Sequence, residues 1–60
     1  MQVRIGELTA RLQPEGERTL VRYLDSQGEL LEIEYLDKYV LKSDPRIRRR
    51  LRELSQAAQS

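Results

Sequence analysis

Cysteine and histidine are both absent from this chain of 60 residues. Their absence excludes disulfide bridges, thiolate chemistry and zinc sites built from these ligands. Tryptophan and phenylalanine are absent too, and the three tyrosines offer few surfaces on which a nucleic-acid base stacks. A chain this short buries only roughly 60% of its unfolded surface. Because disulfides and zinc cannot stabilise it, association with a second copy is the remaining obvious means, and we expect a homodimer.

Long apolar runs and catalytic motifs are also missing. No run approaches the roughly 20 residues that cross a bilayer, and the first residues lack the charged and apolar regions of a signal peptide. We therefore expect a cytoplasmic protein without membrane contact. The chain has three glycines in all, with no glycine-rich phosphate loop and no nucleophile motif. We expect a binding protein rather than an enzyme, without a metal or a cofactor.

Two turn signals divide the first half of the chain. Gln13-Pro14-Glu15-Gly16 has proline second and glycine fourth, which is typical of a type I turn. Ser26-Gln27-Gly28 ends in a glycine suited to the left-handed residue of a three-residue hairpin loop. Together they predict a three-stranded antiparallel meander, with strands at about 2–13, 17–25 and 29–35.

The alternation of apolar and polar residues predicts a register for this meander. If Asp25 and Glu29 flank the second loop, one face of the sheet is apolar. The expected cross-strand pairs on that face are Tyr23 with Leu31, Val21 with Ile33, and Thr19 with Tyr35. Arg22 and Glu32 then meet on the opposite face. We expect the tyrosines, at positions 23, 35 and 39, to belong to the core rather than to stack on bases.

Two features of the sheet bear on partners. The first strand changes its frame of alternation at Gly6, which predicts a β-bulge. Residues 2–5 then extend beyond the hairpin and are available to pair with a second subunit. The face away from the core is expected to carry Leu20, Leu24 and Leu30 among charged residues. That face is more apolar than solvent contact requires, so it is a possible partner surface.

A connector and a helix follow the meander. Residues 36–42 fit either a short helix or a strand, and we favour the helix. Asp44 followed by Pro45 predicts the cap and the first residue of a longer helix. Its apolar residues fall on one stripe: Ile47, Leu51, Leu54 and Ala58. The expected organisation is a single α+β domain over residues 1–60, with a meander at 1–35, a connector at 36–44 and an amphipathic basic helix at about 45–58.

Charge is distributed unevenly along the chain. Residues 1–37 hold four arginines and eight acids, a net charge of −4, whereas residues 38–60 hold seven bases and two acids, a net charge of +5. Nine of the eleven basic residues are arginine, a bias that genome composition or a thermophilic source also produces. The basic character of the chain is therefore concentrated around its expected C-terminal helix.

The arginines of this helix occupy unfavourable positions. The positive end of a helix dipole disfavours each cation in the first turns by about 0.3–1 kcal/mol, and Arg48 and Arg52 repel each other four residues apart. Placements that break local rules without visible compensation often indicate function. Arginines beside unpaired backbone N–H groups at a helix start suit phosphate or carboxylate oxygens. The candidate binding residues are Arg46, Arg48, Arg49, Arg50 and Arg52.

Three interpretations of this cluster remain open. We expect a non-enzymatic module that contacts DNA or RNA phosphates, with strong salt dependence. In the alternative, the protein is an adaptor or assembly factor whose arginines and sheet edges bind an acidic protein partner. In the third interpretation, the arginines pair within the chain or across a dimer, with Glu29, Glu32, Glu34 and Asp37. Glu32 and Glu34 share one strand face, where carboxylates more often keep an edge strand soluble than act as acid and base.

Overall fold

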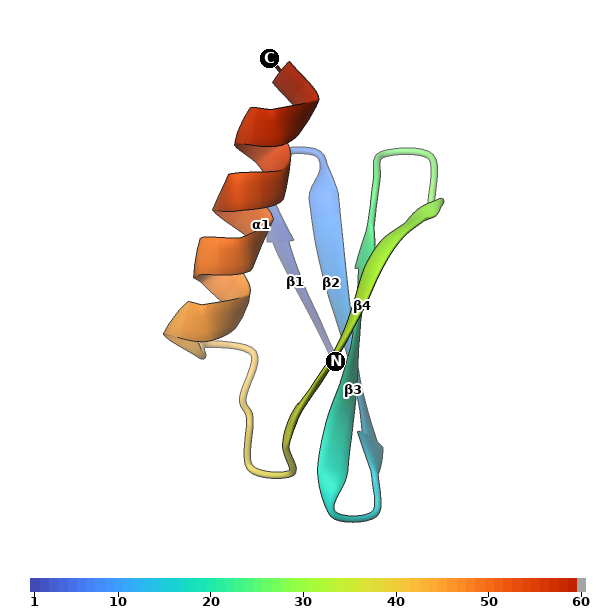
Figure 1. Cartoon of the computed structure of the whole chain (residues 1–60), viewed down its shortest axis with the longest axis vertical. Coiled ribbons are helices and arrows are strands. Elements are labelled where there is room, and N and C mark those ends of the chain that lie inside the picture. Colours follow the sequence, from blue (N-terminus) through green and yellow to red (C-terminus); the bar gives the residue numbers. More distant parts are fainter. Residues whose placement is uncertain (60) are drawn as a thin grey trace.

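Four strands and one helix make up the chain (Figure 1). The structure is a computed structural model and describes residues 1–59. The elements are β1 (Gln2–Ile5), β2 (Leu8–Glu15), β3 (Arg18–Leu24), β4 (Leu30–Asp37) and α1 (Pro45–Gln59). The strands pair in chain order, and every pair is antiparallel. The expected α+β class is confirmed, but the sheet has four strands where three were expected.

The additional strand arises from a hairpin at Gly6. Ile5 pairs with Leu8, so a two-residue turn that starts at Gly6 joins β1 to β2. Gly6 has a φ of 60°, and no other residue type has a positive φ within the described part of the chain. These angles fit a type II′ turn, which suits the twist of a hairpin. The frame change is therefore a turn and not a bulge, and residues 2–5 pair with β2 of their own chain.

The turn between β2 and β3 is tighter than expected. Glu15 pairs with Arg18, and the turn begins at Gly16, which has a φ of 61°. Pro14 therefore lies inside β2. The pair that closes a two-residue hairpin, here Glu15 with Arg18, is hydrogen-bonded. Pro14 belongs to the next pair, which is not hydrogen-bonded, so an N–H at this position would point away from β3 and proline is tolerated. β1 does not need this N–H either, because its pairing with β2 reaches only Arg11.

The loop between β3 and β4 forms as predicted, but the strand after it is displaced by one residue. The N–H of Asp25 donates to the Glu29 carbonyl at 2.9 Å, and Gly28 has a φ of 83°. An irregularity beside Leu24 then shifts the register, so that Tyr23 pairs with Glu32 rather than with Leu31. A one-residue shift exchanges the two faces of a strand. The predicted pairs of Val21 with Ile33, Thr19 with Tyr35 and Arg22 with Glu32 are wrong for the same reason.

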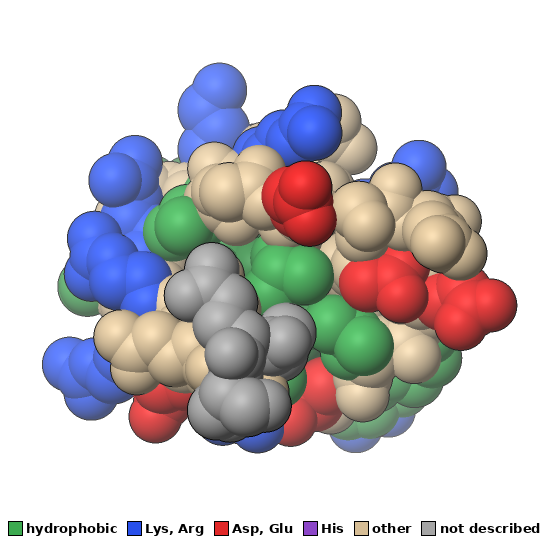
Figure 2. Space-filling model, turned by 90° about the horizontal axis from the view of Figure 1, so that it is seen from above, with side chains coloured by type: hydrophobic (Ala, Val, Ile, Leu, Met, Phe, Trp, Pro, Cys, Tyr) green, Lys and Arg blue, Asp and Glu red, His purple; other side chains and the backbone are tan. Residues whose placement is uncertain are grey.

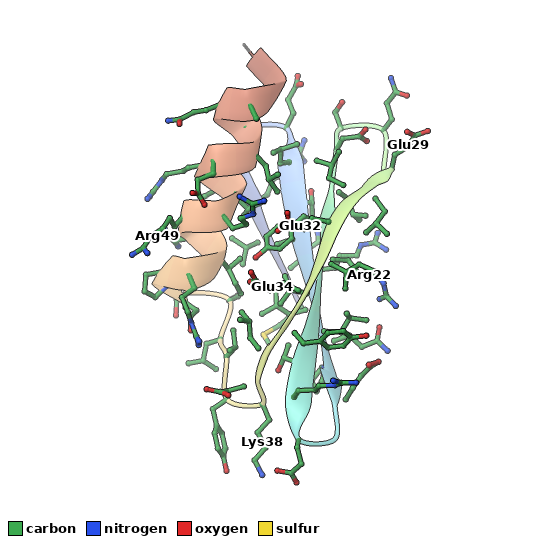
Figure 3. The ribbon with its side chains drawn as sticks, in the orientation of Figure 1. Arg22, Glu29, Glu32, Glu34, Lys38 and Arg49 are labelled. Atoms are coloured by element: carbon green, nitrogen blue, oxygen red, sulfur yellow. The ribbon has the colours of Figure 1, made fainter. Side chains whose placement is uncertain are left out.

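This shift turns the acidic side of β4 toward the helix. Glu32 and Glu34 are half-buried on the helix side (Figure 3), whereas the apolar side chains of Leu31, Ile33 and Tyr35 lie exposed on the outer face. The helix packs chiefly on β1 and β2 (Figure 1). β4 consequently meets the charged flank of α1 and not its apolar stripe, which explains why carboxylates rather than apolar groups face inward there.

The core lies between α1 and the inner face of the sheet. Its buried members are Leu8, Ala10, Leu12, Val21, Tyr23, Val40, Ile47 and Leu51, with Leu54 partly buried beside them. The predicted helix and its stripe are confirmed for Ile47, Leu51 and Leu54, while the side chain of Ala58 lies outside the described residues. Tyr23 is a core residue as expected, but Tyr35 and Tyr39 are exposed.

The connector contains turns and no helix. β4 continues to Asp37, so the helix favoured for residues 36–42 is wrong. The N–H of Val40 donates to the carbonyl of Asp37 at 3.1 Å, and the N–H of Asp44 donates to that of Leu41 at 2.8 Å. These two turns bury Val40 and bring the chain back across the sheet to the start of α1.

Candidate functional site

Asp44 closes the start of α1. Its carboxylate accepts a hydrogen bond from the backbone N–H of Arg46 at 2.8 Å. Its carbonyl accepts from the N–H groups of Ile47 and Arg48 at 3.2 and 3.4 Å. This is the cap that the sequence predicts. Since Pro45 has no N–H, no unpaired backbone donor remains among these described residues, and the expected backbone contribution to anion binding is wrong. The start of this helix therefore offers an anion only side-chain donors.

The same carboxylate holds the side chain of Arg46. The Nε and Nη2 atoms of Arg46 lie 3.1 and 3.0 Å from Oδ1 and Oδ2 of Asp44. The hydrogen bond from this guanidinium is the main cause that lowers the pKa of the Asp44 carboxyl below its ordinary value. Arg46 is therefore already neutralised by an adjacent residue of its own chain.

Arg50 is paired with β4. Its Nε donates to Oε2 of Glu32 at 2.7 Å, and its Nη2 donates to Oε1 of the same carboxylate. Its Nη1 also lies 3.5 Å from Glu53, three residues further along the helix. The hydrogen bond from Arg50 lowers the pKa of Glu32. This pairing depends on the register shift of β4, because the expected register would point Glu32 to the other side of the sheet.

Three candidate arginines have no such partner. Arg48, Arg49 and Arg52, here called the open arginines, are exposed, and no ion pair joins them to a carboxylate within the described part of the chain. At about 100° per residue, they occupy an arc of about 100° on the helix surface. Figure 3 shows Arg49 pointing away from the sheet. The first turn of α1 contains no acidic residue, and Glu53, in the next turns, forms its ion pair with Arg50 and not with an open arginine.

The acids expected to pair with the helix are mostly directed elsewhere. Glu32 is the only one of the four that forms an ion pair with α1 among the described residues. Glu34 instead accepts a hydrogen bond from the Tyr23 hydroxyl at 3.1 Å, and burial together with this carboxylate raises the pKa of Tyr23. Glu29 lies in the distant loop before β4 (Figure 3). Figure 2 shows the largest group of basic side chains on the left of that view, the side of α1.

A second basic group lies on the sheet face away from α1, and the sequence analysis missed it. Strand alternation places Arg4, Arg11, Arg18 and Arg22 on this face. The expected register had matched Arg22 with an acid, whereas Arg22 actually lies opposite Ile33. A usable signal was present for three of the four, because Arg4, Arg11 and Arg22 each stand between two apolar residues and therefore point away from the apolar side of their strands.

Other kinds of site and outside comparisons give no assignment. Among the described residues, no group of three or more acidic, histidine or cysteine side chains is arranged to hold a metal ion. No helix within those residues has the length and apolar character needed to cross a membrane. Protein-family models, curated proteins and solved structures were compared with the chain, and none matches it. Function is therefore inferred from the geometry of the two basic groups.

Proposed function

We propose that this protein is a small non-catalytic module that binds the phosphate backbone of nucleic acids through the open arginines. The observation that carries the proposal is the division of the five candidates into two that are neutralised and three that are not. Arg46 and Arg50 each have a carboxylate within their own chain, whereas Arg48, Arg49 and Arg52 have none among the described residues. The uncompensated repulsion among the three is relieved when an external anion meets them.

The spacing of the open arginines favours a polymeric anion. At 1.5 Å per residue, Arg48 and Arg52 are separated by about 6 Å along the helix axis. A duplex carries one phosphate charge for about every 1.7 Å of its length, so a stretch of this size presents about three charges. Three guanidinium groups therefore match a short stretch of backbone without needing any base contact. Such binding is insensitive to sequence and steeply dependent on salt.

Charge reversal tests the proposal. Arg49→Glu with Arg52→Glu should abolish binding to a mixed-sequence DNA or RNA duplex at low salt while circular dichroism shows an intact fold. The matched control is Lys38→Glu with Lys42→Glu, which changes the net charge equally on the exposed connector. The control should retain most of the affinity, since its charges lie off the arc. Undiminished binding by the arginine variant, or an equal loss in both variants, would contradict the assignment.

A protein-binding adaptor is the second candidate function. The observation in its favour is that β4 is an edge strand of the sheet and exposes apolar side chains, which is the feature that β-strand addition uses. In that case the open arginines meet acidic groups of a partner. Poly-glutamate, used as a competitor, separates the two. Added at the same total charge as the ligand, poly-glutamate should efficiently displace an acidic protein partner. It should displace a bound nucleic acid only weakly.

A further inference from the structure

The outer face of the sheet places two arginines directly opposite each other. Arg11 of β2 pairs with Arg22 of β3, so their Cβ atoms are about 4.5–5.5 Å apart, a distance at which like charges destabilise a sheet. The only side-chain hydrogen bond found for the pair within the described residues is from Arg22 Nη1 to Gln13 Oε1 at 2.8 Å. Gln13 is neutral, so it leaves both charges uncompensated. Arg22 points away from α1 (Figure 3).

A shallow hollow of about 400 Å³ lies beside this pair. It is lined by Met1, Gln2, Arg11, Leu12, Gln13 and Arg22, without a carboxylate. Two guanidinium groups and two amides around one hollow provide hydrogen-bond donors for phosphate oxygens, and the amides also accept hydrogen bonds from base edges. Acidic residues lie around this hollow and not in it: Glu7 and Asp25 line a neighbouring hollow that shares Arg11, and Glu15 and Asp37 pair with Arg18.

The same face carries an exposed aromatic ring on the neighbouring strand. Tyr35 is 51% exposed, and Ile33, two residues before it, is 48% exposed. Ile33 pairs with Arg22, so an apolar surface adjoins the arginine pair. Arg18 stacks over the Tyr35 ring with its guanidinium carbon 4.0 Å from the ring centre. Guanidinium planes and aromatic rings both stack on nucleobases. The outer face therefore combines cations with an exposed aliphatic side chain and a ring that already carries one stacked guanidinium.

We propose that this surface, the sheet platform formed by Arg11, Arg22, Ile33 and Tyr35, binds single-stranded nucleic acid. The phosphates contact the arginine pair, and a base stacks with Tyr35 and its stacked Arg18 beside Ile33. Strands lie about 4.8 Å apart, so the arginines are about 5–10 Å from β4, within the reach of one nucleotide's base and phosphate. A duplex hides its base faces and cannot use the ring, which sets the preference for a single strand. The proposal extends the proposed function to a second surface for the same class of polymer.

Charge argues against a second copy of the chain as the occupant. Two outer faces stacked about the arginine pair would bring two Arg11–Arg22 pairs together, and the hollow beside each pair contains no carboxylate. Joining β4 to β4 about Ile33 would place Glu32 opposite Glu34 of the other copy, and like charges directly opposite are destabilising. Carboxylates on an edge strand discourage such pairing. A polyanion meets neither obstacle.

The decisive experiment compares tyrosine variants on two probes. A labelled mixed-sequence single strand and the same strand in duplex form are titrated by fluorescence anisotropy at low salt. Tyr35→Ala should weaken single-strand binding by about 5- to about 140-fold, the range for loss of one stacked base, and leave duplex binding unchanged. Tyr39→Ala is the matched control, because Tyr39 is 79% exposed but lies on the connector. It should change neither affinity.

Three outcomes overturn the inference. The first is that the Tyr35 and Tyr39 variants bind the single strand with equal affinity. The second is that the Tyr35 variant loses equal affinity for the single strand and the duplex. The third is that poly-glutamate binds as strongly as the oligonucleotide and that this binding also depends on Tyr35. If Tyr35→Ala unfolds, Arg11→Gln with Arg22→Gln decides the matter. That pair should lower the single-strand salt slope by about 1.4, and an unchanged slope contradicts the platform.

The helix variants separate this inference from the proposed function. Replacing all three open arginines by glutamine should weaken duplex binding and lower its salt slope, and it should leave the Tyr35 dependence of single-strand binding in place. If the triple variant still binds duplex as the wild type does, the proposed function fails, while the Tyr35 comparison still decides the sheet platform. If the triple variant binds duplex more weakly than the wild type and Tyr35→Ala changes nothing, only the sheet platform fails.

Discussion

The pairing state of each helical arginine predicts its contribution to the salt dependence of binding. Each arginine that contacts a duplex phosphate steepens the slope of log affinity against log salt by about 0.9. Replacing Arg48, Arg49 and Arg52 by glutamine should therefore reduce the slope by about 2.7. Arg46 and Arg50 are held by carboxylates of their own chain, so replacing both by glutamine should change the slope little.

This difference is large enough to measure. A slope change of about 2.7 means that, between about 50 and about 200 mM salt, wild-type affinity for a duplex falls about 40-fold further than that of the triple variant. Had Arg46 and Arg50 contributed equally, their double variant would show a slope change of about 1.8, which is a difference of about 12-fold over the same salt range. Fluorescence anisotropy across a salt series measures both slopes, and circular dichroism checks the fold of each variant. An equal slope change per charge in the two variants would refute the argument that internal pairing removes an arginine from the interface.

The remaining predictions concern the fold and the assembly. Because the pKa of Glu32 is lowered from 4.5 by Arg50, its stabilising effect is present above pH 4.5 and is lost as the pH falls through the lower folded value. The difference in unfolding free energy between wild type and Glu32→Gln, measured with urea, should shrink below that pH; a constant difference would contradict the pairing. Leu51 is fully buried, so Leu51→Ala should cost about 2–5 kcal/mol out of roughly 3–9 kcal/mol for a domain of this size. Thermal unfolding should show a large loss of stability, and a melting point like that of the wild type would show that α1 does not dock as described. The homodimer expected from the small core stays a prediction, and a monomer mass in sedimentation at high micromolar concentration would exclude it.

Local signals in the sequence predicted the elements that depend on local chemistry. Asp44 followed by Pro45 is typical of a helix start, and the observed cap and first helical residue are the predicted ones. The three-residue loop ending at Gly28 also formed as predicted, since a left-handed residue is needed there. At Gly6, however, a bulge and a two-residue turn produce the same frame change, and the sequence alone does not distinguish them.

The candidate site was predictable only in part because the faces of β4 were not. Alternation in Leu31 to Tyr35 indicates that apolar and acidic residues point to opposite sides, and burial of apolar area favours turning the apolar side inward. The helix does not cover β4 with its apolar stripe, so ion pairing with Arg50 and the hydroxyl of Tyr23 prevail there. Because the acidic side of β4 faces inward, Glu32 pairs with Arg50 and not with Arg22. The orientation of β4 therefore decides which arginines are paired within the chain and which are available to a ligand.

The most direct test of the account is amide NMR during titration with a short mixed-sequence duplex at low salt. It locates the contact on the protein without any substitution. The account predicts that the largest shifts fall on residues 48–52 of α1, with smaller changes at Glu32 because its ion pair stays closed. Saturable binding with no shifts along that stretch of helix would contradict it.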